Sequence, residues 1–79
     1  MHSETLKNLR CWINDLKEAQ RMHTYEYWNL LQTAASDRSK DYSSELISRA
    51  QTIARCESEL QVARATYENL LMLEEKQNH

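Results

Sequence analysis

Ser36-Asp37-Arg38-Ser39-Lys40-Asp41 is the stretch that decides the fold, because here the helix-favouring sequence on either side is interrupted. Every residue in it is polar. Ser and Asp side chains compete with the helix backbone for hydrogen bonds, so they favour caps and turns over helix interiors. We therefore predict a turn over residues 36–42, with Asp41 or Ser43 capping the helix that follows.

The sequence on both sides of this turn is predicted to be helical. The chain of 79 residues contains no Gly and no Pro, the residues that mark tight turns and strand ends. It is rich in Leu, Ala, Glu, Gln, Lys and Arg, which are good helix formers. We predict helices over about 4–35 and about 43–76, within a single domain spanning 1–79.

Apolar residues recur in each predicted helix at steps of three and four, with interruptions, which is typical of helices that pack side by side. A short polar link between two long helices makes them antiparallel neighbours. The expected fold class is therefore all-α, an antiparallel two-helix hairpin like a coiled coil. One continuous helix is the alternative, because nothing in the turn strictly forbids helix. The first seam comprises Leu6, Leu9, Ile13, Leu16, Tyr27, Leu30 and Ala34, and the second comprises Leu46, Ala50, Ile53, Leu60, Tyr67 and Leu71.

Polar residues interrupt both seams at the same level. If the turn centres near Ser39, residues whose numbers sum to about 79 or 80 face each other, which places His23 beside Glu57. Gln20 lies next to Leu60 in the same register. Buried polar layers fix register and oligomeric state at some cost in stability. The pattern allows two interpretations: a polar core layer of Gln20, His23 and Glu57, or a seam edge where Glu57 turns to solvent.

Apolar residues outside the seams predict a contact surface. Met22, Tyr25 and Trp28 project away from the first seam, and Trp12 lies at its border. Aromatic residues and Met are enriched at protein interfaces. We expect a partner-binding surface centred on Tyr25 and Trp28, with shielding by long neighbouring side chains as the alternative.

Composition argues against several other functions. The 10 basic and 12 acidic residues form no basic stripe, so nucleic acid is not the expected partner, and a small transcriptional regulator is only an alternative. No apolar run is long enough to cross a bilayer, and we expect neither a signal peptide nor membrane binding. Two cysteines, Cys11 and Cys56, are too few for a disulfide scaffold, so a reducing, cytoplasmic location is expected.

We expect no catalysis, no small-molecule substrate, and no metal or other cofactor. A metal site needs three or four ligands close together, and only His23 and Cys56 approach each other in the predicted hairpin. A nucleophilic Cys–His pair needs an orienting group and a concave pocket, which two helices do not form. The predicted function is instead a protein-interaction module, an adaptor, chaperone or inhibitor that binds a partner protein or completes a bundle as a homodimer.

Three features resemble known helical families. The size, acidity and hairpin layout, with Lys40-Asp41-Tyr42, resemble the co-chaperones that hold needle subunits in bacterial type III secretion, which implies a chaperone function. Ser43-Ser44-Glu45-Leu46 resembles the signature of helical-hairpin phosphatases of sporulation regulators, but Ile47 replaces the required aspartate. Leu9-Arg10-Cys11-Trp12-Ile13 resembles the first helix of a spectrin repeat, although the chain is too short for that three-helix unit. None of the three resemblances identifies a family.

Overall fold

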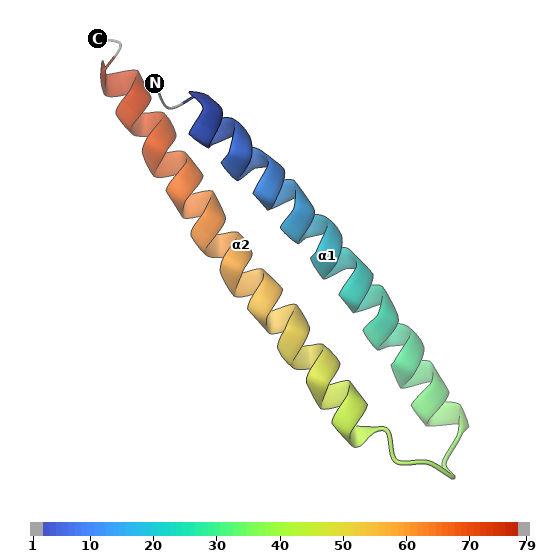
Figure 1. Ribbon diagram of the computed structural model, residues 1–79. Helices are drawn as coiled ribbons and strands as arrows, with labels where there is room; N and C mark the ends of the chain where they lie inside the picture. The colour runs from blue at the N-terminus through green and yellow to red at the C-terminus, as the bar shows by residue number, and fades with distance from the viewer. Residues whose placement is uncertain (1–2, 78–79) are drawn as a thin grey trace.

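The computed structural model describes residues 3–77 and consists of two long helices joined by a short turn (Figure 1). Helix α1 spans Ser3–Ser36 and helix α2 spans Ser43–Gln77. The helices run antiparallel and pack against each other, so the predicted all-α hairpin is confirmed and the single continuous helix is excluded. The helix bounds lie within one residue of those expected from the sequence.

The side chain of Asp37 organises the turn. Its Oδ1 atom accepts hydrogen bonds from the Ser39 backbone N–H at 3.0 Å and from the Ser39 hydroxyl. The Tyr42 hydroxyl donates to Oδ2 at 3.2 Å. The pKa of Asp37 lies below its usual value of 3.8, chiefly because the carboxylate accepts the hydrogen bond from the Ser39 hydroxyl and then because it accepts the one from the Ser39 backbone. The chain therefore turns without glycine, and within residues 3–77 no residue has a positive φ.

Asp41 caps the start of α2. Its Oδ1 atom accepts a hydrogen bond from the Ser43 backbone N–H at 2.9 Å, as a helix cap does. The Leu46 N–H bonds to the Tyr42 carbonyl at 3.0 Å and closes the first turn of the helix. Hydrogen bonds from the side chain and then the backbone of Ser43 lower the pKa of Asp41. Of the two caps predicted, Asp41 is the one observed.

The core is a single thin layer between the helices. Ile13 and Leu16 of α1 pack against Leu60 and Ala63 of α2, with Tyr67 partly buried beside them. Ala63 has 0% of its surface exposed and is the most deeply buried of these core residues. Leu16 and Ala63 have numbers that sum to 79, and those of Ile13 and Tyr67 sum to 80, and all four lie in this cluster, as the predicted register requires.

The hairpin is a narrow rod. Its Cα atoms extend over 65 × 14 × 12 Å, and the radius of gyration of 18.2 Å exceeds the ~12 Å of a compact domain of this length. The Ser3 end of α1 and the Gln77 end of α2 lie together at one end, and the turn lies at the other (Figure 1). Within residues 3–77, neither helix has a segment apolar and long enough to span a membrane.

Candidate functional site

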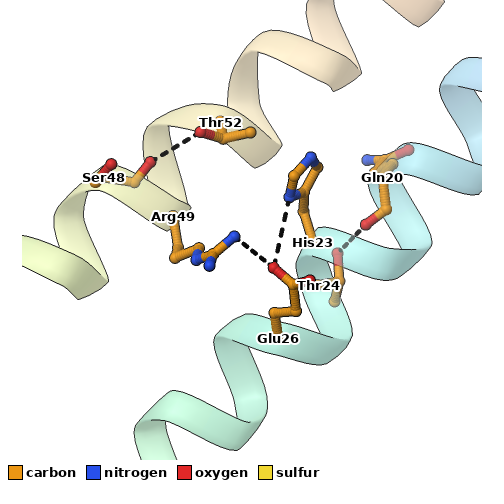
Figure 2. Close-up of polar contacts among 7 residues, drawn as sticks. All are labelled: Gln20, His23, Thr24, Glu26, Ser48, Arg49 and Thr52. Carbon is orange, nitrogen blue, oxygen red and sulfur yellow. Dashed lines mark hydrogen bonds and ion pairs between the residues drawn. The ribbon is translucent and has the colours of Figure 1, made fainter.

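A polar cluster joins the two helices between the core and the turn (Figure 2). Arg49 of α2 donates a hydrogen bond to Glu26 Oε2 on α1, and His23 Nδ1 lies 3.9 Å from the same oxygen. Figure 2 shows both side chains directed toward the Glu26 carboxylate. His23 Nδ1 is buried, and among the described residues it has no hydrogen-bond partner, because 3.9 Å is longer than a hydrogen bond.

The neighbouring hydroxyl groups do not extend this cluster across the hairpin. The Thr24 hydroxyl donates to the Gln20 backbone carbonyl at 2.7 Å, and the Thr52 hydroxyl donates to the Ser48 carbonyl at 3.1 Å (Figure 2). Such bonds to the preceding helical turn satisfy each hydroxyl within its own helix. The link between the helices at this level is therefore the pairing of Arg49 with Glu26.

The polar core layer differs from the one predicted. Gln20 and His23 are half-buried at the helix interface, but Glu57 is exposed. Glu57 does not belong to this layer. Its side chain remains in water, where an unpaired carboxylate is well solvated, as in the seam-edge interpretation of the sequence. Glu26 faces His23 instead, and the Arg49 guanidinium compensates its charge. A role of Gln20 and His23 in setting register stays a prediction.

Two cross-helix links were not anticipated from the sequence. Besides the pairing of Arg49 with Glu26, Arg10 Nη2 donates to the Tyr67 hydroxyl at 3.1 Å, with its guanidinium carbon 5.9 Å from the ring centroid. The numbers of each pair sum to 75 and 77, below the 79 or 80 expected for residues directly opposite each other. A long arginine side chain reaches a neighbouring turn of the facing helix. Pairing residues by the sum of their numbers therefore does not predict such contacts. Glu26 and Arg49 carry opposite charges beside the two seams, and this signal in the sequence could have identified their pairing.

The aromatic cluster on α1 lies outside the core. Tyr25 is 69% exposed, Trp28 is 60% exposed and Met22 is 55% exposed. The three residues follow each other at intervals of three positions, which places them along one side of the helix. Trp12 is 42% exposed and lies nearer the open end of the hairpin. Neighbouring side chains leave Met22, Tyr25 and Trp28 largely accessible, and the role of these residues in partner binding stays a prediction.

The structure adds an open groove that the sequence did not indicate. Tyr25 and Trp28 line it together with Leu60 of α2, and it has a volume of about 700 Å³. Lys17 and Arg21 of α1 and Arg64 of α2 bring positive charge to the same groove. A smaller hollow of about 290 Å³ lies against Tyr25 and Met22. The groove combines residues from both helices, so it becomes visible only once the register of the hairpin is known.

No grouping of metal ligands accompanies these surfaces. Within residues 3–77, no group of three or more His, Cys, Asp or Glu side chains lies close enough together to hold a metal ion. Cys11 is exposed and Cys56 is half-buried, and both are free thiols. The features that remain as a candidate site are the exposed aromatic cluster and the groove beside it.

No protein-family model matches the chain, and comparison with curated proteins and with solved structures finds no match. The resemblances of short stretches to secretion co-chaperones, phosphatases and spectrin repeats therefore gain no support. Fold and site define the class of molecule, a two-helix hairpin with an exposed aromatic surface.

Proposed function

We propose that this chain is a non-catalytic protein-interaction module, a helical hairpin that binds a partner protein or a second copy of itself, as an adaptor, chaperone or inhibitor does. The observation that carries the proposal is the exposure of Met22, Tyr25 and Trp28 together on one side of α1. Aromatic residues and Met are enriched at interfaces, and removing their apolar area from water is favourable by roughly 25 cal/mol per Å². Another protein chain would supply that burial.

The thin core supports the same proposal. The solvent-accessible surface of 6275 Å² exceeds the ~5,000 Å² expected of a compact protein of 9.4 kDa. The excess of ~1,300 Å² is larger than the ~800 Å² that each partner contributes to a standard interface. Binding one further helix or hairpin would bring the exposed fraction of this chain into the range of compact proteins.

Catalysis is not part of the proposal. A catalytic site needs titratable groups that converge in a concave, water-excluding pocket, whereas two packed helices offer ridges and open grooves. The free thiols of Cys11 and Cys56 support a reducing, cytoplasmic location as the place where the hairpin acts.

Mass measurement by light scattering, paired with thermal melts at several protein concentrations, tests this function. We expect a mass above that of the monomer with a melting temperature that rises with concentration, or a monomer that melts broadly at low temperature because it lacks its partner. A concentration-independent monomer that melts cooperatively at high temperature would contradict the claim that the hairpin depends on a second chain.

The variant Trp28→Ala, studied by the same light-scattering and melting measurements, tests whether the contact surface includes Trp28. Where association is observed, the variant should associate less than the wild type. Val62→Ala is the matched control, because Val62 is 61% exposed on α2 and lies outside the aromatic cluster. Equal loss of association in both variants, or in neither, would show that another surface carries the contact.

A further inference from the structure

We infer that the groove beside Trp28 binds an acidic, amphipathic helical segment of a partner protein. The inference rests on the proposed function and specifies the chemistry of the partner. The apolar lining of the groove comes from both helices, with the exposed Tyr25 and Trp28 of α1 and the mostly buried Leu60 of α2. An occupant therefore contacts α1 and α2 at once and makes a third helix of the bundle.

The charge of the groove selects an acidic occupant. Lys17, Arg21 and Arg64 line it, and the other polar lining residues in the described chain, Gln20 and Thr24, are neutral. Arg21 is paired with Glu18 at 2.7 Å, whereas Lys17 and Arg64 form no ion pair within residues 3–77. The protein as a whole carries a net charge of −2, so this is a local concentration of cations around an apolar strip. Potentials at specific interfaces are complementary, which predicts carboxylates on the partner.

The spacing of the lining residues fits a helix as the occupant. Lys17, Arg21 and Trp28 recur on α1 at steps of four and seven, so they follow one side of the helix over three turns. At 1.5 Å per residue this strip is roughly 16 Å long, enough to contact about three turns of a second helix. Carboxylates beside the apolar stripe of that helix would meet the cations at the edges of the groove.

A second copy of this chain is a poorer occupant. In a two-fold symmetric dimer the same patch faces itself, so Lys17 and Arg64 of one copy would approach the same cations of the other. Nucleic acid is also a poorer occupant, because duplex recognition uses a longer series of phosphate contacts than three cations provide.

A second groove, nearer the turn, differs from the groove beside Trp28 in its lining. It has a similar volume, about 690 Å³, but Glu26, Glu45 and Arg49 line it together with Ser, Thr and Asn side chains. Leu30 is its only apolar lining residue within the described chain. It offers neither an aromatic anchor nor a single sign of charge, so the docking surface is the groove beside Trp28.

Two designed peptides test the inference with the full chain. The acidic probe is a fluorescein-labelled peptide of three Leu-Glu-Glu-Leu-Leu-Glu repeats, and the basic probe replaces every Glu by Lys. We expect fluorescence anisotropy to show at least tenfold tighter binding of the acidic probe, weakening as salt is added. In a Trp12→Phe background, Trp28 is the single remaining tryptophan, so its emission should shift when the acidic probe binds.

Variants locate the binding. Trp28→Ala and Arg64→Glu should each weaken the binding of the acidic probe about tenfold or more, since a few anchor residues dominate the binding energy. The controls are Met72→Ala and Arg55→Glu, which change an exposed apolar and an exposed cationic side chain on α2 outside the groove. Circular dichroism melts establish that each variant folds, so that a loss of binding is not a loss of the hairpin.

Several outcomes would overturn the inference. These are equal binding of the two probes, no binding of the acidic probe, or wild-type affinity in Trp28→Ala and Arg64→Glu. Binding of a short DNA duplex that is lost in Arg64→Glu would identify nucleic acid as the occupant, and a dimer lost in Trp28→Ala would identify a second copy. A hairpin that self-associates through another surface and ignores the acidic probe refutes this inference alone. A stable, concentration-independent monomer whose melting the probe leaves unchanged refutes the proposed function as well.

Discussion

Arg49 and Glu26 form an ion pair across the hairpin, although they lie 23 positions apart in the sequence. Each side chain is 44% exposed, so water screens the pair and its effect on stability is modest. The same Glu26 carboxylate faces His23, which makes Glu26 the centre of the polar contact between the helices. Stability measurements on these three residues test how the hairpin closes.

A double-mutant cycle on Glu26→Gln and Arg49→Gln should give a coupling of about 0.2–1 kcal/mol, the range for partly exposed ion pairs. The coupling should shrink as salt is added, because the two side chains are accessible to ions. Urea unfolding of the wild type, both single variants and the double variant measures it. A coupling of zero at low salt would show that the two residues do not interact in solution.

His23→Leu should raise the free energy of unfolding by about 1 kcal/mol, because it removes a buried nitrogen that has no hydrogen-bond partner among the described residues. Thermal melts measure the change, and light scattering shows whether the oligomeric state changes with it. His23→Gln keeps a polar side chain at the site and serves as the control. A large loss of stability in His23→Leu would refute the idea that this residue trades stability for specificity.

Leu60→Ala should lower the free energy of unfolding by about 2–5 kcal/mol, because it leaves a cavity in a core with few other buried side chains. Ala63→Leu should also destabilise the hairpin, by about 1–3 kcal/mol, since it places a larger side chain where Ala63 is fully buried between the helices. Val62→Ala, an exposed change between these two positions, should stay within about 0.5 kcal/mol of the wild type. Equal effects at all three positions in chemical unfolding would place the core elsewhere.

Acid should weaken the turn. The pKa values of Asp37 and Asp41 are lower in the folded chain than the ordinary value of 3.8, so their hydrogen bonds contribute fully to stability above that pH. That contribution is lost as the pH falls below 3.8 and through the lower folded values. The melting temperature followed by circular dichroism should therefore decrease in this range.

Asp41→Asn isolates the effect of the cap. Asn caps helices about as well as Asp, so the variant should melt near the wild-type temperature at neutral pH and lose less stability in acid. Asp15→Asn changes an exposed carboxyl of α1 away from the turn and should keep the wild-type acid dependence. An identical acid response in Asp41→Asn and the wild type would remove Asp41 as a source of the pH dependence.

The hairpin followed from the sequence because its causes are local. The absence of Gly and Pro, the seams of apolar residues and the polar stretch around Asp37 each act within a few residues. Side-chain bonds from Asp37 and Asp41 replace the glycine that commonly ends a helix, which explains how a glycine-free chain turns.

The polar contact between the helices was predicted only in part. The sequence placed His23 at the interface, but it assigned Glu57 as the facing carboxylate where the structure has Glu26. Glu57 lies at the edge of the seam, where a long side chain reaches water. The groove beside Trp28 was not predictable at all, because Arg64 and Trp28 share it only through the tertiary register.

The placement of both helix ends at one end of the rod determines how the hairpin responds to force (Figure 1). A load applied between Ser3 and Gln77 pulls the helices apart sideways, so contacts separate one level at a time, from Leu6 toward the turn. Few contacts bear the load at any moment, and the turn keeps the two separated helices connected to each other. Such a hairpin separates level by level, whereas a load along the rod axis would shear all of its interhelical contacts together.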